Sequence, residues 1–289
     1  MRHRYTYVSL SGLPELSKWN SYLTKLAVRR VFSIKKGVVN RDHAKPLSMR
    51  LPIRISPCPI VEAIAEIRFE PTVPPDAVFG QLYNTFSGKF GNLKQLPGKA
   101  ISEAIRQANP LFRYQAHYHL EGEGIAVLIG PEVFAVGMLG SSYPGWSALS
   151  DAFRGTFALL LDTKVVKTVH RLGLRYTNFF DRDILQELTL SFTIDDEKIS
   201  GESTFFKTVL PREGCKLLLQ VGKDVALPTK PGIPGTLIDI DAYQEFPVMG
   251  LDFNASISKF LSTSHTHEKA LFFNLLRKDF LDTLNPVYE

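Results

Sequence analysis

Cysteine is scarce in this chain, since only Cys58 and Cys215 occur among its 289 residues. Two thiols so far apart exclude a disulfide framework and a four-sulfur metal site. They suit a reducing cytosol, so we expect a cytoplasmic protein. The chain also lacks any run of about 18 apolar residues, the minimum length for a helix that spans a membrane. The sequence therefore predicts no membrane partner.

Common motifs of catalysis and cofactor binding are missing as well. The chain contains no G-x-x-x-x-G-K-[ST] loop, no G-x-G-x-x-G after a strand, no G-x-S-x-G elbow and no H-E-x-x-H pair. We therefore predict no cofactor. The composition, with 44% hydrophobic and 22% charged residues, is that of an ordinary globular protein, which excludes the disordered, collagen-like and coiled-coil classes.

Acidic residues are almost absent from the first 50 positions. Residues 1–50 hold 11 of the 34 Lys and Arg residues but only 2 of the 29 acidic residues, which leaves the remaining chain with a net charge of −4. Nucleic acid is therefore expected to bind only through this basic leader, if at all. We predict that residues 1–50 are poorly ordered or an over-extended start before Met49. A docked extension of the fold and a targeting or membrane-surface segment are the alternatives.

The body of the chain, residues 51–289, is expected to be a single domain in which short strands alternate with a few helices. The element order favours two similar halves, 57–182 and 183–289. Period-two alternation predicts strands at 60–69, 112–120, 125–129, 133–138, 165–179, 188–194, 204–210, 216–222 and 236–244.

Helical spacing of apolar residues predicts four helices in the same body. One starts near Asp76 and buries Val78, Leu82, Phe86 and Phe90, and a weaker one covers 100–108 with Ile101 and Ile105 inward. A third runs from Trp146 through Leu160, and a last long helix spans 266–284 and ends at Asn285-Pro286. Short turns between strands favour antiparallel pairing, so the fold class is α+β, with mostly antiparallel sheet, helices on one face and a long C-terminal helix.

Two pairs of histidines are weak candidates for metal ligands. His117 and His119 point the same way from the predicted 112–120 strand, and His265 and His267 repeat that spacing. The four imidazoles could hold zinc if the start of the last helix lay over the strand. We favour solvated histidines, with Ser264 or Thr266 as the N-cap of that helix, so no metal is assigned.

Two further residue groups have a possible chemical role. Asp239 and Asp241 share one face of a strand and could hold Mg²⁺ or act as acid and base, although the solvent face of a half-buried strand is the favoured interpretation. Cys215 precedes Lys216, whose charge could lower the pKa of the thiol. No general base is evident for Cys215, so the sequence assigns no catalytic residue.

Charged residues at matching intervals provide the main site candidate. Glu62 and Glu66 form an acidic pair, and Arg171 and Arg175 form a basic pair at the same spacing of four residues. We favour cross-strand ion pairs with a structural role if the two strands lie in one sheet. If they line a cleft, the same residues would form a polar binding face.

These segments also carry a resemblance to a known family. The chain resembles the TIGR04255 family, a sporadically distributed prokaryotic family of unknown function, at Pro59–Glu62 through Glu70, at Tyr143–Trp146 with Phe153, at Arg171–Asn178, at Leu237–Asp241, and from His267-Glu268 through Phe280. The resemblance implies one framework made of the acidic strand, the returning strand and the C-terminal helix. It implies a prokaryotic cytoplasmic setting and a natural start near Met49, and it supplies no catalytic residue.

The sequence thus favours a non-enzymatic binding or accessory protein whose partner is another protein. The patchy distribution of the family suggests a stress or defence system. The alternative is an enzyme, either a metal-dependent hydrolase that uses His117, His119, His267 or the Asp239 and Asp241 pair, or a small-ligand enzyme.

Overall fold

The computed structural model describes residues 5–6, 50–139, 143–191, 193–194, 197–198, 203–246 and 253–288. Most of the basic leader, and with it the proposed start at Met49, lies outside the described residues. Within the leader, Tyr5–Thr6 forms the short strand β1.

Ten strands form one sheet, whose order is β1-β11-β12-β7-β2-β6-β5-β4-β3, with β10 also paired to β11. Every pairing except that of β1 is antiparallel, as the short turns predict. The bounds are Ile60–Pro71 (β2), Asn92–Gln95 (β3), Tyr118–Glu121 (β4), Ala126–Ile129 (β5), Val133–Leu139 (β6), Val166–Phe180 (β7), Thr204–Arg212 (β10), Cys215–Leu227 (β11) and Lys230–Glu245 (β12). Two short strands, Thr193–Ile194 (β8) and Glu197–Lys198 (β9), pair separately.

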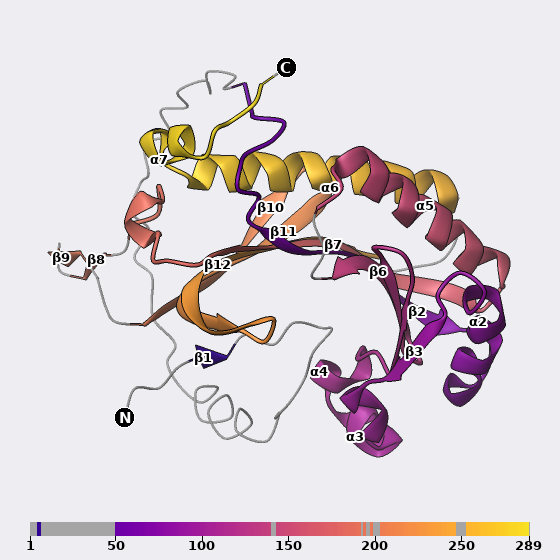
Figure 1. Ribbon diagram of the computed structural model, residues 1–289. Coiled ribbons are helices and arrows are strands. Elements are labelled where there is room, and N and C mark those ends of the chain that lie inside the picture. Colours follow the sequence, from indigo (N-terminus) through magenta and orange to yellow (C-terminus); the bar gives the residue numbers. More distant parts are fainter. Residues whose placement is uncertain are drawn as a thin grey trace, which may run out of the picture.

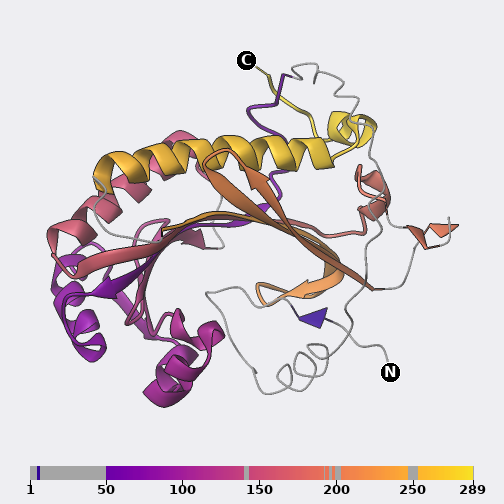
Figure 2. The ribbon, with the colours of Figure 1, turned by 180° about the vertical axis from the view of Figure 1, so that it is seen from behind.

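The helices are α2 (Val78–Phe86), α3 (Glu103–Ala108), α4 (Pro110–Arg113), α5 (Trp146–Asp162), α6 (Phe253–Leu275) and α7 (Lys278–Thr283). Short 3₁₀ turns occur at Pro75–Ala77, Pro97–Ala100 and Leu185–Glu187. The two long helices, α5 and α6, run across one face of the curved sheet, and the short α3 and α4 lie on its other side (Figures 1 and 2). The α+β class with a long C-terminal helix is therefore confirmed.

The main core lies between the sheet and the long helices. Leu149, Phe153 and Phe157 of α5 and Ile257 and Leu261 of α6 pack on the sheet there. Side chains alternate between the faces of a strand, so the residues between the core positions of β2, β7 and β12 face the opposite side. No helix in the described part of the chain is both long and apolar enough to cross a membrane.

Three local predictions are wrong in the segment that leads to β4. Residues 110–113 are helical, and the strand expected over 112–120 begins only at Tyr118. His117 and His119, expected in solvent, are buried because Leu96 and Ala116 pack over the same face of the sheet. In the preceding helix, Arg106 is buried while Ile105 is exposed.

The C-terminal helix also differs from the prediction. Helix α6 begins at Phe253 instead of 266, and a break near Leu276 separates it from α7. The serine- and threonine-rich first half of α6 hides an apolar stripe that includes Ile257 and Leu261. Ser264 and Thr266 therefore lie inside the helix, and their assignment as an N-cap is wrong.

Candidate functional site

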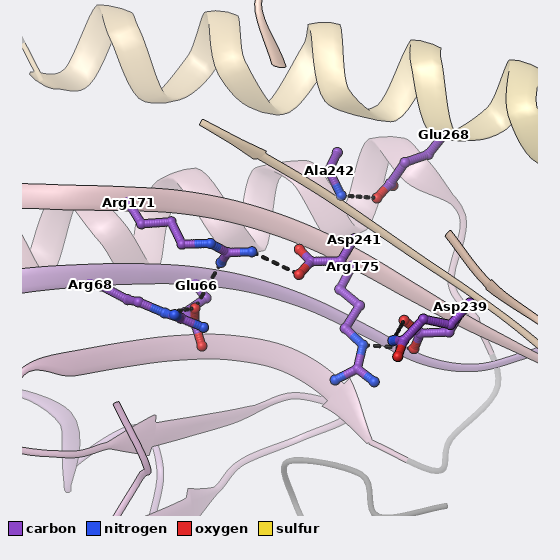
Figure 3. A network of polar contacts seen from close by, with 9 residues as sticks. Glu66, Arg68, Arg171, Arg175, Asp239, Asp241, Ala242 and Glu268 are labelled. Atoms are coloured by element: carbon purple, nitrogen blue, oxygen red, sulfur yellow. Dashed lines mark hydrogen bonds and ion pairs between the residues drawn. The ribbon is translucent and has the colours of Figure 1, made fainter. Parts of the chain in front are cut away.

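Charged residues of three neighbouring strands meet on the face of the sheet that α5 and α6 do not cover. We call this group the charge ladder, and Figure 3 shows it with the strands that carry it and with α6 on the other side of these strands. Strand β7 lies between β2 and β12, so its arginines can reach carboxylates on both neighbours. The ladder consists of Glu66, Arg68, Arg171, Arg175, Asp239 and Asp241.

Arg171 joins all three strands through one guanidinium group. Its Nη1 donates to Glu66 Oε1 at 2.9 Å, and its Nη2 donates to Asp241 Oδ2 at 2.7 Å. Arg68 Nε donates to the same Glu66 oxygen at 2.7 Å. The guanidinium also lies 4.7 Å from the ring centroid of Tyr243. The side chains of Arg171 and Glu66 are only 11% and 8% exposed, so solvent screens this pair little.

Asp239 is the second centre of the ladder and is completely buried. Its Oδ2 accepts hydrogen bonds from Arg175 Nε at 2.7 Å and from Thr177 Oγ1 at 3.0 Å. Its Oδ1 accepts from Gln220 Nε2 at 3.1 Å. Three donors from β7 and β11 therefore satisfy this carboxylate, as a buried charge requires.

Gly173 provides the space in which the Arg171 guanidinium lies. A Cβ atom at position 173 would come within 2.5 Å of Arg171 Nη1. Gly173 follows Arg171 by two residues, so both face the same side of β7. The Arg-Leu-Gly-Leu-Arg run of β7 therefore combines two arginines with the glycine that lets the first lie flat across the sheet.

Burial and neighbouring charges shift the pKa values of ladder residues in opposite directions. Burial raises the pKa of Asp241, although Arg171 and Arg175 act to lower it. For Arg171, burial favours the neutral form, but Asp241 and Glu66 outweigh it and raise the pKa of the guanidinium. The base is therefore held in its charged state between two carboxylates.

The structure gives different partners to the main candidates, which are Glu62, Glu66, Arg171 and Arg175. Glu66 and Arg171 meet as an ion pair, whereas Arg175 bonds Asp239 of β12. Glu62 is buried on the same face of β2, opposite Thr177 in the register. The interpretation that Asp239 and Asp241 lie on a solvent face is wrong, because arginines of β7 bond to both carboxylates. The spacing of four residues shared by the other two pairs does not extend to Asp239 and Asp241, which are two residues apart, so only their common face of the strand could have indicated arginine partners.

A separate polar group lies on the helix-covered face. Glu268 of α6 is buried, and its Oε1 accepts the backbone N–H of Ala242 at 3.1 Å (Figure 3). Burial raises the pKa of Glu268 well above its usual range. His265 Nδ1 lies 3.2 Å from the Tyr176 hydroxyl, and the imidazole stacks on Trp146 at 4.0 Å between centroids. Burial lowers the pKa of His265 to about 4.

The four histidines do not form one metal centre. His119 packs opposite Leu128 on the face of α3, whereas His265 contacts Tyr176 on the opposite face. His267 is half-buried and contacts the carbonyl of Glu213. Within the described part of the chain, no three residues among His, Cys, Asp and Glu are grouped so that they could hold a metal ion.

Cys215 is a poor nucleophile in this environment. Its side chain is buried against the core, and burial raises the pKa of the thiol. The thiolate that covalent catalysis needs is therefore disfavoured, in spite of the neighbouring Lys216.

Comparison with known proteins adds no functional assignment. No family model matches the chain, and no curated protein matches it. The resemblance to the TIGR04255 family stays a prediction, supported by the segments that carry it.

Proposed function

We propose that this chain is a non-enzymatic binding protein whose partner is another protein. The observation that supports this proposal is that the charged residues of the ladder are bonded to one another. Asp239 accepts three hydrogen bonds and is fully buried, and Glu66 accepts from two guanidinium groups through one oxygen. A general acid or base needs free access to a substrate proton, which the fully buried and hydrogen-bonded Asp239 does not offer.

In this proposal the ladder is a scaffold that connects β2, β7 and β12. Removing one member of a buried ion pair costs about 3–5 kcal/mol, because the remaining charge stays buried without its partner. Catalytic sites behave differently, since their residues are kept at the expense of stability and their substitution is often neutral or stabilising. The effect of a substitution on unfolding therefore separates the two roles.

The test compares Asp239→Asn with Glu245→Gln in urea unfolding of the full chain. Glu245 lies on the same strand, but its side chain is 59% exposed and pairs with Lys216 at the surface. We expect a loss of about 3 kcal/mol or more for Asp239→Asn and less than about 1 kcal/mol for Glu245→Gln. An unchanged or higher stability of Asp239→Asn would contradict the scaffold role.

The competing function is a metal-dependent hydrolase that uses Asp239 and Asp241. Elemental analysis of the purified chain and calorimetric titration with Mn²⁺ and Zn²⁺ address it directly. A stoichiometric metal whose binding is lost in Asp239→Asn would overturn the proposal of a non-enzymatic protein.

The proposal also includes the cellular location of the protein and the kind of system in which it acts. A cytoplasmic location agrees with the two cysteines, both of which are free thiols. Participation in a stress or defence system stays a prediction that rests on the distribution of the resembling family.

A further inference from the structure

Strand β10 lies at an open edge of the sheet. It pairs with β11 from Thr204 to Arg212, and no other strand in the described ranges pairs with it. An edge strand exposes a row of backbone N–H and C=O groups, to which another extended chain can add. Native proteins often protect such edges with bulges, prolines or charges. In β10 these features are limited to Lys207 in the middle and to Pro211 and Arg212 at the C-terminal end, so the stretch that can accept another strand is Thr204–Leu210.

The hairpin geometry identifies which backbone groups point outward. A two-residue turn, Glu213-Gly214, joins β10 to β11, so Arg212 and Cys215 form the closing pair. The closing pair of a two-residue hairpin is hydrogen-bonded, and hydrogen-bonded pairs recur at every second residue. The even-numbered residues of β10 therefore bond to β11. Phe205, Lys207 and Val209 direct both of their backbone groups to the open edge.

The same three residues present an apolar, basic, apolar pattern to solvent. Phe205 is 52% exposed and Val209 is 47% exposed, and the exposed Lys207 lies between them. Phe206 and Leu210 point the other way and pack on the main core. The strand is thus anchored through one face, while its other face is exposed and its edge pairs with no strand of the described residues.

We infer that β10 binds an extended segment of a protein partner as an added antiparallel strand, with an acidic side chain opposite Lys207 and apolar side chains opposite Phe205 and Val209. This inference rests on the proposed function, since it locates the surface for the protein partner. Strand addition obtains affinity from main-chain hydrogen bonds and specificity from alternate side chains.

Charge complementarity identifies an acidic segment as the occupant. Lys207 and Arg212 are the only charged residues of β10. Lys207 forms no ion pair with any described residue, whereas the neighbouring Lys216 is paired with Glu245. An opposite charge directly across from Lys207 contributes about 0.2–1 kcal/mol, and a like charge destabilises by a similar amount.

A second copy of this chain fits the edge less well. A two-fold axis at Lys207 would place two lysines directly opposite each other, which is unfavourable. Shifting the axis toward Val209 places Pro211 opposite Phe205, where the partner must donate an N–H that proline lacks. Both of these registers disfavour self-pairing, whereas an acidic segment of a different protein meets neither obstacle.

The test uses the full chain and two fluorescent peptides, Ser-Thr-Val-Thr-Glu-Thr-Val-Thr-Ser and the same peptide with Lys in place of Glu. Anisotropy titration should show tighter binding of the Glu peptide than of the Lys peptide to the wild type, by about two- to thirtyfold, because the attraction and the repulsion add. Lys207→Glu should reverse this preference. Lys94→Glu, on the opposite edge strand β3, is the control for a charge reversal elsewhere on the sheet and should leave the preference unchanged, although it also breaks the exposed ion pair with Glu121.

Val209→Pro tests the backbone contribution. It removes an outward N–H and leaves the hydrogen bonds to β11 in place, so we expect both peptides to lose at least tenfold in affinity while the melting temperature changes little. If Val209→Pro unfolds the chain, Val209→Lys replaces it, because a second lysine next to the edge should weaken the Lys peptide most.

The outcomes distinguish a failure of the β10 binding surface from a failure of the proposed function. Absence of peptide binding to the wild type, or binding unaffected by both Val209 variants, would overturn the assignment to β10. If the chain nevertheless purifies from its natural host in a stoichiometric complex with another protein, the proposed function stands. Dimerisation in light scattering that Val209→Pro abolishes would instead make a second copy the occupant.

Discussion

The Arg171 guanidinium on β7 lies between Glu66 on β2 and Asp241 on β12, at 2.9 and 2.7 Å from their carboxylate oxygens. Since β7 is hydrogen-bonded to both of these strands, the side-chain pairs reinforce the backbone ladders on either side. The guanidinium therefore cross-links strands from the two predicted halves of the domain.

A double-mutant cycle should measure the link between Glu66 and Arg171. We expect Arg171→Gln to cost about 3–5 kcal/mol, because two carboxylates lose their shared cation in a nearly dry environment. Glu66→Gln should cost less, and the double variant should be more stable than the sum of the single losses predicts, by about 1 kcal/mol or more. Urea unfolding measures each value. Additive losses would mean that the two residues do not interact.

Gly173→Ala should displace the Arg171 guanidinium, because the new methyl group would meet Nη1. The arginine side chain is flexible, so we expect a loss of about 1–3 kcal/mol, mostly from weakened ion pairs. The same substitution in the Arg171→Gln background should cost clearly less. An equal cost in both backgrounds would indicate a backbone effect of the alanine itself.

Glu268 should make the protein less stable as the pH rises. Its pKa in the folded chain is raised by burial, so the native state holds this proton over a pH range in which the unfolded chain has lost it. The associated stability is present below the ordinary pKa of a glutamate and is lost as the pH rises toward the folded value. Glu268→Gln should flatten this part of the curve of unfolding free energy against pH. If the variant keeps the wild-type slope, a group other than Glu268 causes this pH dependence.

His117 and His265 should make the protein less stable as the pH falls. Burial lowers the pKa of each imidazole to about 4, so the unfolded chain binds these protons first. Stability should be full above about pH 6.5, the unperturbed value for histidine, and should decrease as the pH falls toward 4. NMR titration of the imidazole protons checks the two values directly. Midpoints near the unperturbed value would show that neither ring is buried as described.

Patterns of period two and 3.6 were sufficient for most elements near the charge ladder. Strand β2, the hairpin after Glu121, helix α5 and strand β7 lie where alternation and helical spacing place them, because each carries at least one clear apolar stripe. The start of α6 was missed because serines and threonines interrupt its stripe. The 112–120 segment was missed because its alternation continues through residues that become helix.

Alternation in recognisable strands already shows that Glu66, Arg171 and Asp241 are candidates for ion pairs. Which of these charges meet depends on how the strands are arranged in the fold. The order of the strands and the bulges within β2 set the register, and a shift of one residue would turn every side chain to the other face. Burial of Asp239, His117 and Glu268 likewise depends on elements distant in the chain, because a carboxyl or imidazole leaves water only when the rest of the fold closes around it.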